Sequence, residues 1–147
     1  MRKRILVSAC LLGVCCRYDG RGNPSAQVLD LLNRDDLELI PVCPEQLGGL
    51  PTPRLPSERV EDRIINRAGE DVTDQFQRGA AEALRLARSY GCDVAILKER
   101  SPSCGCGRIY DGSFTGKLTE GDGVTTELLL SAGIRVVGES RIEQLTE

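Results

Sequence analysis

The sequence predicts an α/β fold, a compact three-layer Rossmann-like domain built on a mainly parallel sheet of about four strands. The first observation is that short apolar runs alternate with helical patterns, because parallel strands need a crossover between them. The second is the size of the chain, since 147 residues with 40% hydrophobic side chains can bury one core. We therefore expect residues 1–147 to form a single domain with helices on both faces of the sheet.

The expected elements follow one another in the order β–α–β–α–β–α–β. Four short runs rich in Val, Ile and Leu are interpreted as buried strands. They cover residues 4–8, 38–42, 94–97 and 134–137. The loops that follow the first three strands are dense in Gly, Pro and Cys, so the residues that could form a site gather there.

Three helices are expected between these strands. Ser25 can cap a short first helix. The clearest helical pattern covers residues 74–90, where Asp74 is the expected cap and apolar residues recur at helical spacing. The last helix is expected to begin at Asp122 or Thr125.

The composition argues against several classes of function. The formal charge is −3, from 19 Lys and Arg against 22 Asp and Glu, so the basic face that binds nucleic-acid polymers is not expected. Aromatic residues make up only 3% of the chain, which argues against a stacking platform for single strands but not against a free nucleobase. No apolar run reaches the ~18 residues of a membrane helix and no signal-peptide cleavage region is evident, so a cytoplasmic protein is expected.

Seven cysteines and the absence of histidine define the chemistry that the chain can support. An odd number of cysteines without a signal peptide does not fit a secreted disulfide framework, and it favours metal, cluster or thiol chemistry. The absence of histidine removes Ser-His-Asp triads, Cys-His dyads and zinc sites built with imidazole. Sulfur, carboxylate, hydroxyl, amine and guanidinium groups remain.

Three cysteines follow the ends of three expected strands. Cys10 lies two residues after the first strand, Cys43 directly after the second, and Cys104 in the loop after the third. Ligands of parallel α/β sheets bind beyond the carboxyl ends of the strands. If the first strand lies between the other two, a strand spacing of ~4.8 Å brings the three cysteines together. The alternative is that they are buried as small hydrophobic side chains.

The other four cysteines rank below this triplet as ligands. Cys15 and Cys16 are adjacent to each other, and Cys106 lies two residues after Cys104. Adjacent or near-adjacent thiolates rarely all bind one centre, so these three are not expected to be ligands. Cys92 stands where the third strand begins, at the opposite edge of the sheet, and is interpreted as a packing residue.

Two residues near the triplet are candidates for proton transfer. Glu45 follows Cys43 by two residues, and Ser101 precedes Cys104 by three. In a chain without histidine, a carboxylate and a hydroxyl beside the centre are the groups that can move a proton or position water. The alternatives are an ordinary surface carboxylate and an ordinary turn serine.

Two loop elements share an aromatic–Asp–Gly pattern, at residues 17–20 and 108–112. The pattern is typical of a turn, and both turns should project from the same sheet edge, where either could form the wall of a pocket. Residues 112–123 contain four glycines and Phe114, which suits a mobile lid. There is no P-loop and no G-x-G-x-x-G motif, so binding of nucleotide phosphates is not supported.

Five blocks of sequence stand out when they are taken together. They are Val-Ser-Ala-Cys-Leu-Leu-Gly at residues 7–13, Arg-Tyr-Asp-Gly at 17–20, Pro-Val-Cys-Pro-Glu-Gln-Leu-Gly-Gly-Leu-Pro-Thr-Pro-Arg at 41–54, Lys-Glu-Arg-Ser-Pro-Ser-Cys-Gly at 98–105, and Arg-Ile-Tyr-Asp-Gly at 108–112. This combination resembles the thiouracil desulfidase family. The resemblance runs from about residue 4 to residue 142, which is nearly the whole chain.

The resemblance implies an α/β domain that carries a [4Fe–4S] cluster on Cys10, Cys43 and Cys104. The fourth iron would then lack a protein ligand and take the thiocarbonyl sulfur of a thiolated pyrimidine such as 2- or 4-thiouracil. Glu45 and Ser101 match the family positions that carry protons and activate the water. The implied reaction is a hydrolase-like cleavage of a carbon–sulfur bond that releases uracil and hydrogen sulfide without net redox.

Two other hypotheses stay open from the sequence. A sulfur carrier or thiol-redox protein would use Cys104-x-Cys106 or Cys15-Cys16 and would work without iron. A non-catalytic sensor would hold a cluster and bind a ligand without turnover. The physiological substrate and the oligomeric state are not fixed by the sequence.

Overall fold

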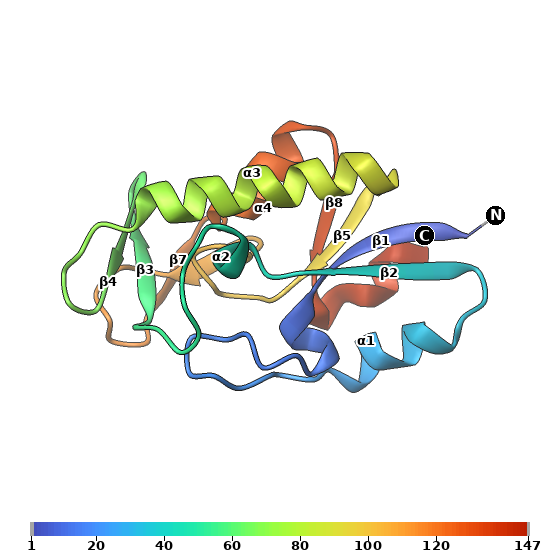
Figure 1. Ribbon diagram of the computed structural model, residues 1–147, viewed down its shortest axis with the longest axis horizontal. Coiled ribbons are helices and arrows are strands. Elements are labelled where there is room, and N and C mark those ends of the chain that lie inside the picture. Colours follow the sequence, from blue (N-terminus) through green and yellow to red (C-terminus); the bar gives the residue numbers. More distant parts are fainter. Residues whose placement is uncertain (1, 147) are drawn as a thin grey trace.

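The structure, a computed structural model that describes residues 2–146, is built on a four-stranded sheet (Figure 1). The strands are β1 (Lys3–Ser8), β2 (Leu37–Val42), β5 (Val94–Leu97) and β8 (Arg135–Gly138), in the order β2–β1–β5–β8. Every neighbouring pair is parallel. The predicted α/β class and its parallel sheet are confirmed, and the first strand does lie between the second and the third.

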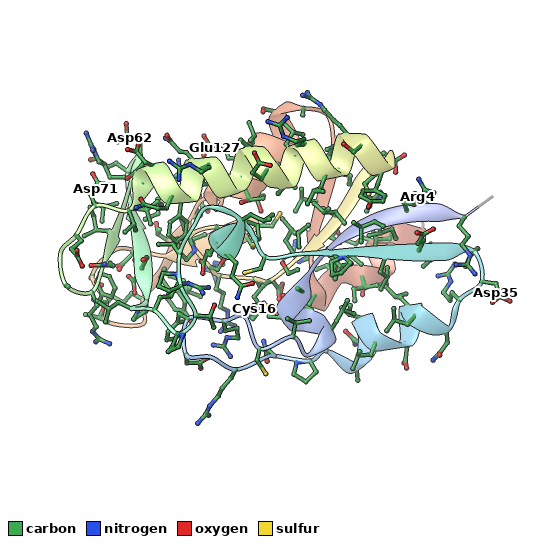
Figure 2. The ribbon with its side chains drawn as sticks, viewed as in Figure 1. Arg4, Cys16, Asp35, Asp62, Asp71 and Glu127 are labelled. Carbon is green, nitrogen blue, oxygen red and sulfur yellow. The ribbon has the colours of Figure 1, made fainter. Side chains whose placement is uncertain are left out.

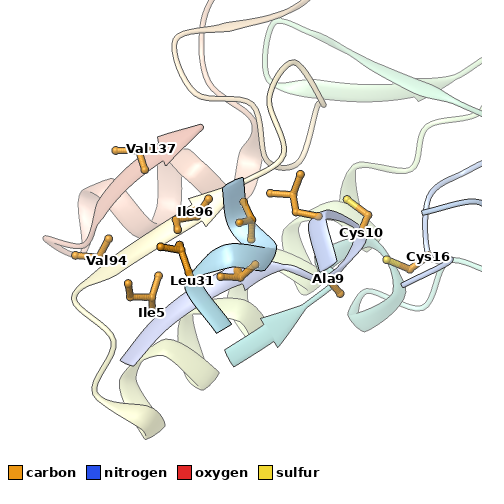
Figure 3. Close-up of a cluster of buried hydrophobic side chains, with 11 residues drawn as sticks. Ile5, Ala9, Cys10, Cys16, Leu31, Val94, Ile96 and Val137 are labelled. Carbon is orange, nitrogen blue, oxygen red and sulfur yellow. The ribbon is translucent and has the colours of Figure 1, made fainter. Parts of the chain in front are cut away.

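Side chains of the sheet alternate between two cores, because successive residues of a strand point to opposite faces. Ile5 and Val7 of β1 pack in one core with Leu31, and Leu6 packs in the other core with Ala83. Figure 3 shows the first core, where side chains of β1, β5 and β8 lie around Leu31. The β-branched strand residues thus fix the sheet in the middle of the molecule.

Helices cover both faces of the sheet, which gives the three predicted layers. One face is covered by α1 (Ala26–Asp30) and by the 3₁₀ helices η2 (Leu31–Asn33) and η3 (Glu139–Thr146). The other face is covered by α3 (Thr73–Tyr90) and α4 (Val124–Ser131), and Figure 1 shows the two layers on opposite sides of the strands. Within residues 2–146, no helix is both long and apolar enough to span a membrane.

The first two helix caps agree only in part with the prediction. Ser25 caps α1 as expected, since its Oγ accepts a hydrogen bond from the Val28 N–H at 3.3 Å. Helix α3 begins at Thr73, and the predicted cap Asp74 lies inside its first turn. The N-cap residue is Val72, and Asp71 just before it binds the first helical residue, since its Oδ1 accepts the N–H of Thr73 at 2.9 Å and the hydroxyl of the same residue at 2.5 Å.

The start of α4 also differs from the prediction, because its N-cap residue is Gly123. Both expected caps form other bonds. Asp122 Oδ1 accepts the Gly107 N–H at 2.7 Å, and the hydroxyl of Thr125 bonds that of Ser103 at 2.9 Å. A Cβ at Gly123 would overlap the backbone of Ser103, so glycine allows α4 to begin in direct contact with the loop after β5.

Two antiparallel hairpins lie outside the main sheet and were not predicted. In the first, β3 (Ser57–Val60) pairs with β4 (Arg63–Asn66), and in the second, β6 (Arg108–Tyr110) pairs with β7 (Leu118–Glu120). Their strands have only three or four residues and carry many polar side chains, so they lack the apolar alternation that identifies a strand. Figure 1 shows the hairpins at the left, on the side to which β1 runs.

Residues 112–123, considered as a lid from their glycines, form the turn and the second strand of the β6–β7 hairpin. This segment contains β7, and its turn is attached to the other hairpin. Glu58 of β3 is buried, and its Oε1 accepts the N–H groups of Gly112 at 2.9 Å and Phe114 at 3.1 Å. The segment is therefore a turn held by a carboxylate.

Candidate functional site

A cavity of about 410 Å³ lies beyond the carboxyl ends of β1, β2 and β5. The structure brings together in its lining the five residues selected from the sequence, which are Cys10, Cys43, Glu45, Ser101 and Cys104. Cys10 stands in the 3₁₀ helix η1 (Ala9–Leu12) after β1, Cys43 follows β2, and Cys104 lies in the loop after β5. The sheet edge is thus the meeting point of three thiols.

Cys10 is held by the loop that folds back on η1. Its carbonyl oxygen accepts hydrogen bonds from the N–H groups of Gly13 at 3.1 Å and Asn23 at 2.8 Å. Gly13 ends η1 with a φ of 95°, a left-handed conformation that glycine adopts at little cost. The Cys10 side chain is therefore buried at a fixed place on the cavity wall, with 8% of its surface exposed.

Cys43 stands at the start of α2 (Pro44–Leu47), which also carries Glu45. This short helix rests directly on α3, because a Cβ at Gly79 would overlap the carbonyl oxygen of Pro44. A Cβ at Gly48 would overlap the backbone of α3 in the same way. The two glycines therefore let the two backbones touch, and this contact sets the position of the thiol and the carboxylate of α2.

Cys104 is the most enclosed of the three thiols. Its N–H donates to Ser101 Oγ at 2.7 Å, and its carbonyl oxygen accepts the Thr126 hydroxyl at 2.8 Å. Burial raises the pKa of the Cys104 thiol to about 12, although the hydroxyls of Ser8 and Ser103 act against this rise. The thiol is therefore neutral in the protein alone, and a bound metal would displace its proton.

A fourth thiol, that of Cys16, lies at the same cavity, a placement that the sequence did not indicate. Its side chain is 2% exposed and lines the cavity. A hydrogen bond with the Cys10 thiol is the main cause that raises the pKa of Cys16 to about 11, and the Cys43 thiol is also in contact with it. Figure 3 shows Cys10 and Cys16 as neighbours, and Figure 2 labels Cys16 below α2. The sequence could not show this placement, because consecutive loop residues can face opposite ways: Cys15 is exposed and Cys16 is buried.

The other cysteines lie away from the cavity lining. Cys15 is exposed at the surface. The Cys106 thiol donates to the carbonyl oxygen of Val136 at 3.7 Å, on the side of β8. Cys92 is buried in the core between the sheet and α3, as its interpretation as a packing residue implies.

Glu45 is bound by Arg54, which the sequence had shown only as the last residue of a block. Arg54 Nε donates to Glu45 Oε2 at 2.9 Å, and its Nη2 also donates to that oxygen and, at 3.0 Å, to the carbonyl oxygen of Cys16. The side chains of Arg54 and Glu45 are 7% and 17% exposed, so this is a nearly buried ion pair. Arg54 therefore fixes the carboxylate and the loop of the fourth thiol at once.

Replacing Arg54 by alanine is expected to lower the free energy of unfolding by about 3–5 kcal/mol, because the Glu45 carboxylate would stay buried without its partner. Urea unfolding of the metal-free protein measures this change. Arg34→Ala is the matched control, since Arg34 pairs with Asp36 at the surface and should cost less than about 1 kcal/mol. Equal losses in the two variants would contradict the importance of the buried pair.

Ser101 lies in the same cavity, three residues before Cys104. Its Oγ accepts the N–H of Cys104, a bond that uses an oxygen lone pair and leaves the hydroxyl hydrogen as a donor. Its carbonyl oxygen accepts the Gly105 N–H at 2.9 Å, which closes the turn. The hydroxyl is thus held by the backbone of a thiol-bearing residue.

The charged residues of the lining suit an anionic group. Five cations and three carboxylates line the cavity, which are Arg17, Arg54, Arg67, Lys98 and Arg100 with Glu45, Glu58 and Glu99. A [4Fe–4S]²⁺ core with three thiolates carries a net charge of −1. The excess of cations would therefore offset the charge of such a group.

The donor set fits an iron–sulfur cluster. Soft thiolates are the ligands that iron–sulfur clusters take in proteins, and the cysteines after β1, β2 and β5 supply three of them. In the described part of the chain, residues 2–146, no three Cys, Asp, Glu or His side chains lie close enough to hold one metal ion. A cluster requires a wider spacing, because each cysteine binds a different iron.

The two aromatic–Asp–Gly turns form part of the wall, as the sequence suggested. Tyr18 of the first turn and Tyr110 of the second both line the cavity.

A family model described as 2-thiouracil desulfurase matches residues 5–141. The chain belongs to the 2-thiouracil desulfurase family. The family named from the sequence blocks is confirmed, and the 2-thiouracil desulfurase match covers the whole cavity lining.

Two relatives extend the 2-thiouracil desulfurase match to nearly the full chain. An uncharacterized protein of Bacillus subtilis (strain 168), YbbK, is 43% identical over an alignment of 151 positions that covers 96% of this chain and 99% of that protein. The solved structure of a [4Fe–4S]-dependent thiouracil desulfidase, TudS, has a TM-score of 0.91 and 45% identity, and the match covers 99% of this chain and 96% of that one. This chain therefore shares its α/β fold with TudS.

Proposed function

We propose that this protein is a [4Fe–4S]-dependent thiouracil desulfidase that converts 2- or 4-thiouracil to uracil and releases hydrogen sulfide. The observation that carries the proposal is that three thiols from three strand ends line one cavity together with Glu45 and Ser101. The family match and the likeness to TudS support the same assignment. We also propose that residues 1–147 act as one domain.

Cys10, Cys43 and Cys104 would hold the cluster through their thiolates. Three cysteines for four irons leave one iron without a protein ligand, and this iron would supply a Lewis acid with affinity for sulfur. Cys16 is not assigned as a ligand in this proposal, although its side chain lines the same cavity. Cys16 would therefore lie beside the three ligands without binding iron.

The reaction exchanges a thiocarbonyl for a carbonyl, with water as the co-reactant. The water oxygen forms a bond to the carbon that bears the sulfur, and the carbon–sulfur bond then breaks. The sulfur leaves with the electron pair of that bond as hydrosulfide, and the second proton of water converts it to hydrogen sulfide. The products are uracil and hydrogen sulfide, and no electron is gained or lost overall.

Glu45 and Ser101 carry the protons in this proposal. The ion pair with Arg54 holds the carboxylate of Glu45 at the cavity wall, where it can accept a proton from water. The Ser101 hydroxyl can donate a hydrogen bond to the attacking water and so position it. Glu45 comes from α2, which follows β2, and Ser101 comes from the loop after β5, so the two groups approach the substrate from two walls of the cavity.

The proposal is tested by supplying thiouracil to protein whose cluster has been reconstituted without oxygen. We expect equal amounts of sulfide and uracil to appear, and no sulfide to appear after the iron has been removed with a chelator. Absence of sulfide from both 2- and 4-thiouracil, in protein with full iron content, would overturn the assignment. Full activity without iron would instead favour the sulfur-carrier hypothesis.

A further inference from the structure

The aromatic residues of this chain are concentrated at the cavity. The chain has three Tyr, two Phe and no Trp, and four of these five rings line the cavity. They are Tyr18, Phe76, Tyr110 and Phe114. Aromatic side chains are scarce in this protein, so their position at one site points to a ligand with a flat ring.

Phe114 lies in a hairpin turn, whereas Phe76 lies in the core of the protein. Phe76 belongs to the core on α3, where it is 2% exposed and packs against Ile64 and Val72. Phe114 stands at the tip of the β6–β7 hairpin and is half-buried. It therefore contributes little to the main cores, and its ring is free to contact a ligand.

The backbone of Phe114 adopts a conformation that needs support. Its φ is 57°, in the left-handed region that a bulky residue occupies at a cost of ~1–3 kcal/mol. The support comes from Glu58, because one carboxylate oxygen accepts the N–H groups of Gly112 and Phe114 at 2.9 and 3.1 Å. A buried carboxylate of one hairpin thus determines where the other hairpin presents its ring.

The ring itself is held by a cation. The guanidinium carbon of Arg67 lies 5.8 Å from the centre of the Phe114 ring, and both side chains line the cavity. A cation at this distance is attracted by the ring electrons and limits the rotation of the side chain. Glu58 and Arg67 therefore hold the backbone and the ring of the same residue.

We propose that Phe114 is a substrate-binding residue whose ring contacts the flat face of the pyrimidine, and that Glu58 is the residue that positions it. This inference rests on the proposed function for the identity of the substrate. Stacking depends on the flat face of a ring and not on its hydrogen-bonding groups, so uracil and thiouracil should both use the contact. A ring that is not flat, such as 5,6-dihydrouracil, should not.

The test measures the binding of uracil and 5,6-dihydrouracil by calorimetry to protein loaded with its cluster. In Phe114→Ala, the Kd of uracil should rise roughly tenfold, within the range of about 5- to 150-fold that corresponds to the loss of one stacked base. The Kd of dihydrouracil should stay unchanged. Tyr90→Ala is the matched control, because Tyr90 is exposed on α3, packs with Arg4 and lies outside the cavity lining.

The positioning role of Glu58 is tested by two substitutions. Glu58→Ala removes the acceptor of both N–H groups and should weaken uracil binding about as much as Phe114→Ala, while the double variant should be no worse than either. Glu58→Gln keeps one carbonyl oxygen and should restore most of the affinity. A Glu58 that served only the stability of the hairpin would lower the unfolding midpoint without this pattern in Kd.

The results separate this inference from the proposed function. An unchanged uracil Kd in Phe114→Ala, or an equal loss for uracil and dihydrouracil, overturns the role of Phe114. Phe114→Leu keeps an apolar side chain without the ring and decides the question if the alanine variant does not fold. Wild-type protein that binds uracil through Phe114 but releases no sulfide would refute the desulfidase assignment and leave the ring site standing.

Discussion

Replacing Cys104 by alanine is expected to give a folded protein that takes up no iron–sulfur cluster and releases no sulfide from thiouracil. Cys104 is buried in the loop after β5, and two remaining cysteines cannot hold a four-iron cluster that needs three. Iron and acid-labile sulfide, measured after anaerobic reconstitution, report the loss directly. The visible absorbance of the cluster should disappear with them, and Cys10→Ala and Cys43→Ala should behave in the same way.

Cys92→Ala is the matched control for this experiment, because Cys92 is equally buried but packs in the core away from the cavity. It should keep the full iron content. Cys16→Ala is the sharper comparison, since its thiol contacts those of Cys10 and Cys43. Ligation by three cysteines predicts that this variant keeps its cluster, and loss of iron would show that a fourth cysteine closes the open iron.

Replacing Glu45 by glutamine is expected to lower kcat by roughly 10²–10⁴, the contribution of a positioned general base. Glutamine has nearly the same shape and cannot accept the proton of water, while its oxygen can still bond Arg54. The iron content and the cluster absorbance should therefore stay at the wild-type level. Steady-state sulfide release with 4-thiouracil measures the change in rate.

Glu127→Gln is the control for the loss of a carboxylate in an ion pair. Glu127 pairs with Arg59 at 2.8 Å on the outside of the molecule and does not line the cavity. Its rate should match that of the wild type. A Glu45→Gln variant with unchanged kcat would show that another group moves the proton.

The sheet and the meeting of the three thiols could be predicted because they depend on local patterns. The run from Ile5 to Val7 has the composition of a buried strand, and residues after parallel strands meet at one edge whatever the details of their loops. The sequence alone therefore predicts that Cys10, Cys43 and Cys104 lie near one another. The [4Fe–4S] assignment came from the resemblance of the sequence blocks.

Cys16, Arg54 and Glu58 could not be predicted because their roles depend on how loops fold against each other. Cys16 faces inward and Cys15 outward, and no rule of spacing distinguishes two adjacent loop residues. Arg54 reaches Glu45 from nine positions along the chain, beyond the end of α2. Glu58 bonds residues more than fifty positions away, in a hairpin too short and polar to be seen in the sequence.

The contact between α2 and α3 has a consequence for how a substrate enters. Gly48 and Gly79 place the two backbones against each other, and at these two points no side chain stands between them that could rotate. Cys43 and Glu45 are thereby coupled to α3, the longest helix among the described residues. We therefore expect the half of the cavity that carries out the chemistry to be rigid, so that admission of the pyrimidine and departure of uracil depend on small movements of the two hairpins.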